Sequence, residues 1–125
     1  MKQLFILFVI VTAFAACNAQ SDGVKNLSQQ DLTAKLQEKN TVLIDVRTSI
    51  EVAGGYIPES EYFIDINGAN FEQKIAELDT TKTYIMYCRS GGRSGKASSY
   101  MVKNGFSKVY NLEGGILDYT GKLKQ

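Results

Sequence analysis

The stretch Tyr84-Ile85-Met86-Tyr87-Cys88-Arg89-Ser90-Gly91-Gly92-Arg93-Ser94 decides how this chain folds. Its first four residues are an apolar run, which predicts a strand covered on both faces. The helical pattern that follows runs from Ser94, the expected cap, to Asn104. Two glycines and two arginines separate strand from helix, directly after the cysteine. Cationic neighbours and a helix amino terminus lower the pKa of a thiol, so Cys88 is the first candidate nucleophile.

The same alternation of strand and helix extends to both sides of this stretch. Further strands are predicted at 41–46, 62–64 and 108–111, and further helices at 28–38, 50–53, 70–78 and after Gly114-Gly115. Because no hairpin signal interrupts the pattern, the chain is predicted to be an α/β protein with a central parallel sheet of about five strands and helices on both faces. Ligands of such folds bind beyond the carboxyl ends of the strands, where Cys88 and Arg47 both lie.

Residues 1–17 have the pattern of an export signal. Met1-Lys2 is a short positive start, residues 4–14 are apolar, and Ala15-Ala16-Cys17 ends in cysteine. The apolar run is short for a spanning helix, which needs about 20 residues. Phe14–Cys17 resembles a bacterial lipobox, which implies lipidation of Cys17, a tether at 18–23 and a domain at 24–125 on the periplasmic side of the cell envelope. The alternative is plain secretion with cleavage nearby.

Composition limits the function classes that remain. The chain has 125 residues, enough for one domain, and without Lys2 it carries 14 − 1 = 13 basic residues against 13 acidic ones. This balance argues against a nucleic-acid partner. Histidine is absent and Cys88 is the one cysteine after Cys17, which argues against a Cys-His pair and a zinc cluster. We therefore expect no metal and no cofactor. The protein is also expected to be a monomer.

Four segments resemble a single-domain rhodanese, a sulfurtransferase module. They lie in the family's order and spacing: Leu43–Arg47, Gly55–Pro58, Tyr87–Ser94 and Tyr110–Gly115. The central motif, Cys-x-x-Gly-x-Arg-Ser, is the most specific of them, and the likeness covers nearly all of 24–119. The resemblance implies a rhodanese-like three-layer sandwich.

The resemblance also implies a reaction and its residues. Cys88 would carry a sulfane sulfur as a persulfide, from a small anionic donor such as thiosulfate to cyanide or a thiol. The loop that would hold donor and persulfide comprises Arg89, Ser90, Gly91, Gly92, Arg93 and Ser94, and its glycines let backbone amides turn inward as an anion-binding nest. Arg93 would close the loop or hold the donor anion, and Arg89 would tune donor preference from the rim. Asp45 and Arg47 are expected to be supporting residues, an ion pair at a strand end that orders neighbouring loops.

Other interpretations remain open at this stage. Cys88 could be a buried structural thiol, or the domain a non-catalytic binding or sensing module. A Cys-based phosphatase of the related fold has five residues between Cys and Arg, whereas four separate Cys88 from Arg93, which makes a smaller cradle. Thiol–disulfide exchange would lack a resolving cysteine.

Overall fold

The structure is a computed structural model that describes residues 23–125. The predicted signal peptide, the predicted lipidation site Cys17 and residues 18–22 of the predicted tether lie outside the described residues. Within 23–125, no helix is both long enough and apolar enough to cross a membrane.

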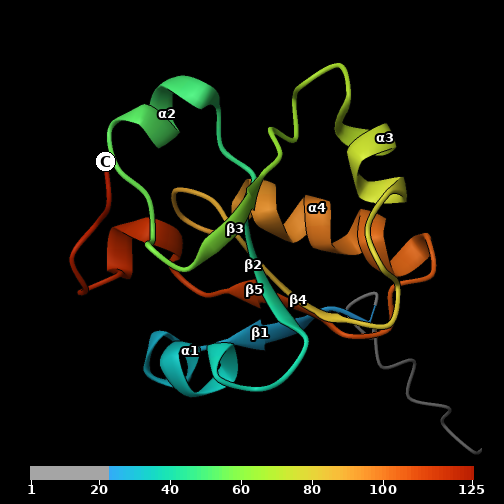
Figure 1. Cartoon of the computed structure of the whole chain (residues 1–125), viewed down its shortest axis with the longest axis horizontal. Helices are drawn as coiled ribbons and strands as arrows, with labels where there is room; N and C mark the ends of the chain where they lie inside the picture. The colour runs from blue at the N-terminus through green and yellow to red at the C-terminus, as the bar shows by residue number, and fades with distance from the viewer. Residues whose placement is uncertain (1–22) are drawn as a thin grey trace, which may run out of the picture.

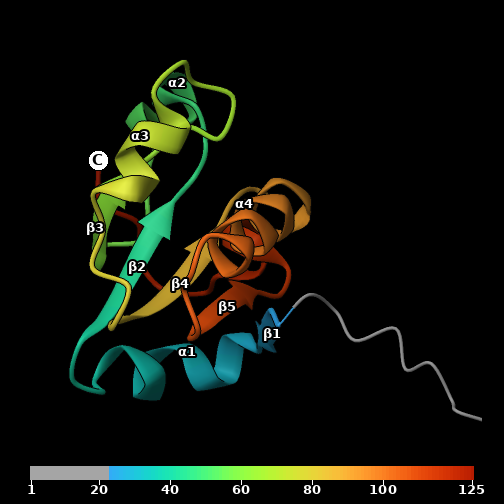
Figure 2. The same cartoon turned by 90° about the vertical axis from the view of Figure 1, so that its right-hand side faces the viewer.

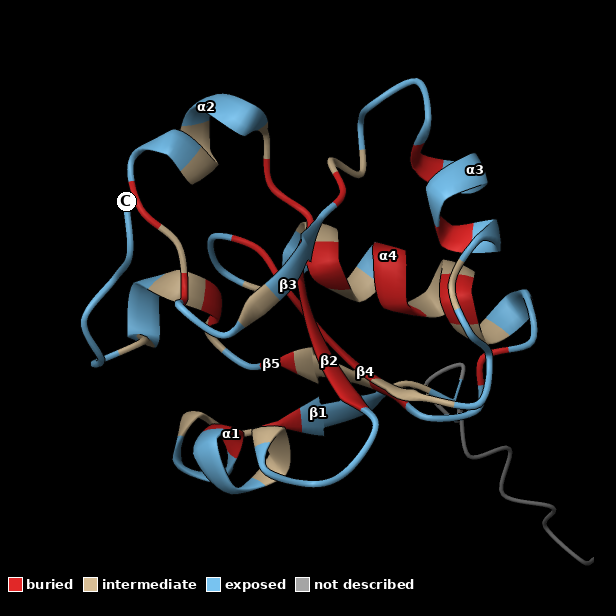
Figure 3. Ribbon diagram, viewed as in Figure 1, coloured by how far each residue is buried: buried red, intermediate tan, exposed pale blue. Residues whose placement is uncertain are grey.

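The core of the fold is a five-stranded sheet in which each strand runs parallel to its neighbours (Figure 1). Its order is β1-β5-β4-β2-β3, and its strands are β1 (Lys25–Leu27), β2 (Thr41–Asp45), β3 (Ser60–Phe63), β4 (Thr83–Tyr87) and β5 (Val109–Leu112). This confirms the predicted parallel sheet of about five strands. Strands β2 and β4 are central and almost wholly buried, as their unbroken apolar runs predicted (Figure 3).

Helices cover both faces of the sheet, which confirms the predicted sandwich of three layers (Figure 2). They are α1 (Gln29–Leu36), α2 (Ser49–Ala53), α3 (Phe71–Ala76), α4 (Gly92–Lys103) and the 3-10 helix η1 (Gly115–Asp118). Ile44 and Met86 point to one apolar cluster with α3 and α4, while Leu43 and Ile85 point to a second with α1 and η1. Successive residues of a strand therefore pack into opposite clusters, as the two-residue period of a strand requires.

Of the two predicted helix caps, Ser28 is confirmed and Ser94 is wrong. Ser28 caps α1 as expected, since its hydroxyl accepts the Asp31 N–H at 3.3 Å. Ser94, in contrast, does not cap α4: the cap residue is Gly91, at φ +111°, and the helix starts at Gly92. Gly91 takes a left-handed conformation that few other residues adopt cheaply, so the chain enters the helix earlier and Ser94 lies buried in its first turn.

Candidate functional site

The ends of two central strands bring the predicted site residues together. Asp45 and Tyr87 are paired in register at the ends of β2 and β4, and the Val46 N–H donates to the Tyr87 carbonyl at 3.0 Å. The chain continues from these ends to Arg47 and Cys88. Because parallel strands end at the same edge of a sheet, both residues reach the carboxyl edge, where α4 also begins.

The sulfur of Cys88 lies at the bottom of the loop and faces its hydrogen-bond donors. It accepts the Gly91 N–H at 3.1 Å and lies 3.3 Å from the Ser94 hydroxyl. Burial alone would raise the pKa of the Cys88 thiol, but the Ser94 hydroxyl and the amides of Ser94, Gly91 and Ser90 together lower it. Cys88 is free and only 1% exposed. The surroundings of this buried sulfur are therefore polar and favour its anionic form.

Asn111, at the end of β5, holds the loop in this shape and was missed by the sequence analysis. Its amide nitrogen donates to the Gly91 carbonyl at 3.0 Å, and its amide oxygen lies 2.6 Å from the Ser94 hydroxyl. The single proton of that hydroxyl thus has two acceptors in reach, Asn111 and the sulfur of Cys88. Asn111 lies within the segment Tyr110–Gly115 that resembles the family, but nothing in that local pattern indicates that its amide reaches a loop 20 residues away.

The 3-10 helix η1 closes the loop from behind. The Ile116 N–H donates to the Cys88 carbonyl at 2.9 Å, and the Leu117 N–H donates to the Arg89 carbonyl at 3.1 Å. Gly115 has φ +58°, and a Cβ there would lie 2.5 Å from both of those carbonyl oxygens. Only glycine allows the backbone of η1 to approach this closely.

The guanidinium of Arg93 is held by Glu51 of α2, a partner that the sequence analysis missed. Its two terminal nitrogens donate to the two carboxylate oxygens of Glu51 at 2.8 and 2.7 Å. Glu51 also accepts the N–H and hydroxyl of Thr48 at 3.0 and 2.9 Å, which completes a capping box. The hydrogen bond from Arg93 is the main reason that the pKa of Glu51 falls to about 2. The first turn of α4 is thereby tied to α2, and the Nε–H of Arg93 is not used by this pair.

Asp45 and Arg47 form the ion pair that was predicted at the end of β2. Arg47 Nη2 lies 2.7 Å from Asp45 Oδ2, Nε contacts both carboxylate oxygens, and Nη2 also donates to the Gly55 carbonyl at 2.8 Å. Both side chains are buried. This pair fixes the segment from β2 through α2 to Gly55, while its supporting role in any reaction stays a prediction.

A hollow of about 400 Å³, here called the mouth, adjoins the loop at Arg89, the residue after Cys88. It is lined by Arg47, Glu51, Gly54, Gly55, Arg89, Ile116, Leu117 and Leu123. Arg89, which lines this hollow, is exposed, and so is the next residue, Ser90. In the part of the chain that the structure describes, no ion pair engages Arg89, and no cluster of three His, Cys, Asp or Glu side chains could hold a metal ion.

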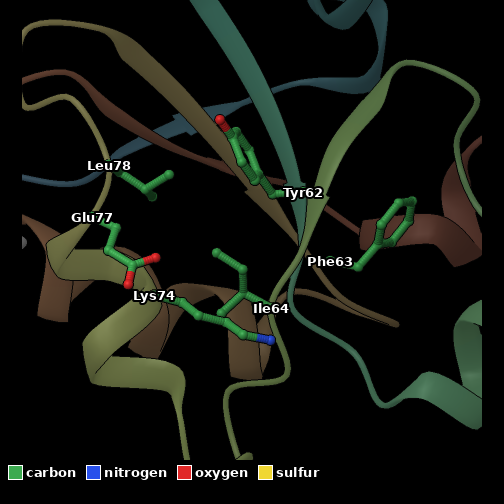
Figure 4. A pocket seen from close by; sticks show the side chains of 6 residues that line it. All are labelled: Tyr62, Phe63, Ile64, Lys74, Glu77 and Leu78. Atoms are coloured by element: carbon green, nitrogen blue, oxygen red, sulfur yellow. The ribbon is translucent and has the colours of Figure 1, made fainter.

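A second hollow, of about 380 Å³, lies between β3 and α3 (Figure 4). Its lining comprises Tyr62, Phe63, Ile64, Lys74, Glu77 and Leu78. It includes no residue of the loop 88–94, so the predicted chemistry does not reach it.

Comparison with known proteins identifies related sequences. A family model described as Rhodanese-like domain matches residues 28–122. A tRNA uridine(34) hydroxylase of Buchnera aphidicola is 36% identical over 108 residues, which are 82% of this chain and 32% of that protein. A tRNA uridine(34) hydroxylase of Yersinia pestis is 31% identical over 105 residues. The chain spans about a third of the length of these curated relatives.

Solved structures agree with the family match. A rhodanese-like domain protein from Staphylococcus aureus has a TM-score of 0.70 and 29% identity, over 80% of this chain and 96% of that one. A rhodanese-related protein from Thermoplasma volcanium has a TM-score of 0.69 and 26% identity, over 80% of this chain and 97% of that one. Both neighbours align with this chain over nearly the whole of their own length.

Proposed function

This chain belongs to the rhodanese-like domain family, and from that premise we propose that it is a sulfurtransferase. It moves a sulfane sulfur from an anionic donor such as thiosulfate to cyanide or a thiol, through a persulfide on Cys88. The observation that carries the proposal is the position of the Cys88 sulfur, which accepts the Gly91 amide at 3.1 Å at the bottom of a loop that lowers its pKa. A thiolate held in this way is a nucleophile.

The loading step needs no further reactant. The Cys88 thiolate attacks the outer sulfur of thiosulfate, the sulfur–sulfur bond of the donor breaks, and sulfite leaves with the electron pair. The product is the persulfide anion on Cys88, whose charge the amides of the loop and the amino end of α4 stabilise. Cyanide then attacks the outer sulfur and leaves as thiocyanate, which returns Cys88 to the thiolate.

The arginines take different parts in this proposal. Arg93, tied to Glu51, sets the shape of the loop and contributes positive charge near the sulfur. Arg89 is exposed and has no carboxylate partner within 23–125, so it meets the anionic part of the donor at the rim. The sequence prediction gave Arg93 either of two roles, and its pairing with Glu51 supports the closing role.

The activity in the names of the curated relatives is not carried over to this chain. Those proteins are about three times as long as the matched region, and the balanced charge of this chain does not suggest a nucleic-acid surface. The proposal therefore rests on the rhodanese-like domain alone.

We also propose that residues 1–17 direct the protein to the periplasmic side of the cell envelope, with lipid on Cys17. The apolar run followed by Ala15-Ala16-Cys17 supports this. Labelling of cells with radioactive palmitate tests it: label on the wild-type chain and none on Cys17→Ser is expected. Label on neither chain would favour plain secretion.

Thiocyanate production tests the sulfurtransferase proposal. Purified protein is given thiosulfate and cyanide, with Cys88→Ser as the matched variant and a phosphatase assay beside it. We expect thiocyanate from the wild type only, and a gain of one sulfur atom in its intact mass when cyanide is left out. Phosphate release would support the phosphatase alternative instead. If no donor loads Cys88, the domain is better explained as a binding or sensing module.

A further inference from the structure

The mouth, which adjoins the loop at Arg89, has more apolar side chains than a small inorganic anion needs. Five large hydrophobic side chains are exposed within residues 23–125, and three of them belong to segments that border this mouth. Ile50 on α2 is 85% exposed, Leu117 on η1 is 57% exposed, and Leu123 in the C-terminal segment is 38% exposed. Leu117 and Leu123 line the hollow, and Ile50 precedes Glu51, which also lines it.

These side chains stand on backbone that is held in place. Leu117 donates its N–H to the Arg89 carbonyl, so η1 is fixed to the loop itself. Next to Leu123, Lys124 exchanges two hydrogen bonds of 2.9 Å with Tyr56, and Leu123 packs so close to Gly55 that a Cβ there would lie 3.2 Å from it. The apolar rim is therefore a preformed surface, which costs little ordering entropy on binding.

Among the charged side chains that line the mouth, the charge that no ion pair compensates is positive. Glu51 is engaged by Arg93, and Arg47 is engaged by Asp45. Arg89 has no such partner in the described chain and stands exposed in the same lining. A ligand that complements this mouth has an apolar part for Leu117 and Leu123 and an anionic group for Arg89.

Thiosulfate and cyanide have no apolar part, so neither uses the leucines of this rim. On the premise of the proposed function, we propose that the sulfur acceptor is a cysteine thiol in a peptide or protein segment with apolar and acidic neighbours. The apolar neighbours of that cysteine pack on Leu117 and Leu123, and its acidic neighbour pairs with Arg89.

The transfer is balanced without an added oxidant or reductant. The Cys88 persulfide anion takes up the proton of the acceptor thiol, the acceptor thiolate so formed attacks the outer sulfur, and a new sulfur–sulfur bond forms. The bond between the outer sulfur and Cys88 breaks, and its electron pair stays on Cys88 as thiolate. The proton remains on the transferred sulfur, so the acceptor leaves as a persulfide. The same hydrogen bonds that lower the pKa of Cys88 make it a good leaving group here.

The test compares acceptor peptides in single turnovers. Persulfide-loaded protein is mixed with a peptide that has leucines beside its cysteine and a glutamate nearby, or with a peptide that has serines in place of the leucines. We expect the leucine peptide to react about tenfold faster, the gain expected from burying apolar surface on a preformed rim. A third peptide, with lysine in place of glutamate, reports on Arg89.

Variants of the exposed rim assign the preference to its residues. Leu117→Ser, Leu123→Ser and Ile50→Ser should each reduce the ratio of the two rates, and Arg89→Gln should reduce the preference for glutamate over lysine. Tyr62→Ser is the matched control, because Tyr62 is 43% exposed but lies on β3 beside the other hollow. It should keep the wild-type ratio. Ratios within one variant are independent of how much of that protein is loaded.

Each other outcome has a definite meaning. Normal loading with equal rates for the leucine and serine peptides overturns the inference and leaves the proposed function intact. An equal fall of the ratio in Tyr62→Ser also overturns it, because the mouth would not be the surface involved. Failure of Cys88 to load with any donor overturns the proposed function, and this inference with it.

Discussion

Replacement of Glu51 by glutamine removes a carboxylate that connects two parts of the site. Glu51 accepts two hydrogen bonds from Arg93 and two from Thr48, so it joins α2 to the first turn of α4. Glutamine has nearly the same size but carries no charge and has only one acceptor oxygen. One hydrogen of Arg93 then faces an amide group, and the capping of α2 is weakened.

The pKa of Glu51 sets the magnitude of this effect. Its fall from 4.5 to about 2 corresponds to about 3 kcal/mol, at about 1.36 kcal/mol for each pKa unit. The two side chains of the pair are 29% and 30% exposed, so solvent screens part of this attraction. We therefore expect Glu51→Gln to lower the free energy of unfolding at pH 7 by about 1 to 2 kcal/mol.

The lowered pKa of Glu51 also determines how the difference in stability between wild type and Glu51→Gln changes with pH. The pKa of Glu51 is lower in the folded protein than in the unfolded chain, so the carboxylate stabilises the fold fully above the unfolded value of 4.5. As the pH falls from 4.5 toward about 2, protons bind the unfolded chain first and this stabilisation is lost. The difference between wild type and Glu51→Gln should thus be less than half as large at about pH 3 as at pH 7.

Urea denaturation followed by circular dichroism at the two pH values measures this difference. Glu61→Gln serves as the matched control, because Glu61 is exposed on β3 and no ion pair of the described chain includes it. The control should be close to wild type at both pH values. A Glu51→Gln penalty that is the same at both pH values, or absent at pH 7, would refute the argument from charge.

Three further outcomes follow from the site. Ser94→Ala removes a hydrogen bond to the sulfur, so the pKa of Cys88 should rise and the midpoint of its iodoacetamide alkylation profile should move to higher pH; an unchanged midpoint would contradict this. Asp45→Asn leaves Arg47 buried without its counter-charge and should cost about 3 kcal/mol in urea denaturation, whereas a loss below about 1 kcal/mol would contradict a buried pair. Gly115→Ala places a Cβ 2.5 Å from two carbonyl oxygens and should slow thiocyanate production more than Gly105→Ala, whose Cβ meets no atom within 4 Å; equal rates would show that η1 does not support the loop.

The sequence predicted those parts of the fold whose signals are local. β2 and β4 are buried on both faces, so each contains a continuous apolar run that is easy to recognise, at 42–44 and 84–87. β1 was not predicted as a strand, because it has three residues of which only Leu27 is buried, too few for a period to emerge. The early start of α4 was missed because the Gly91 carbonyl accepts a hydrogen bond from Asn111, a distant residue that local sequence does not reveal as its partner.

The partners of the loop were harder to predict than the loop itself. Glu51 is 42 residues from Arg93, and Asn111 is 20 residues from Gly91, so only the folded sheet brings them together. One signal for Glu51 was present: Thr48 and Glu51 have the spacing of a capping box, which fixes the carboxylate at the start of a helix. That spacing predicts where the carboxylate lies but not that a distant arginine reaches it.

Because Cys88 is buried, the loop and the rim should contact different parts of the reacting molecules. Cys88 is 1% exposed, whereas the outer sulfur of a persulfide projects by one sulfur–sulfur bond, about 2 Å. The inner sulfur therefore stays among the amides of Gly91 and its neighbours, which respond to its charge whatever molecule supplied the outer sulfur. In the proposed reaction, only the outer sulfur and its carrier would meet Arg89 and Leu117, which line the mouth. Substitutions of Gly91 or Ser94, which contact the inner sulfur, should consequently change the rates of all donors and acceptors together, whereas substitutions of Arg89 or Leu117 should change the order of preference among them.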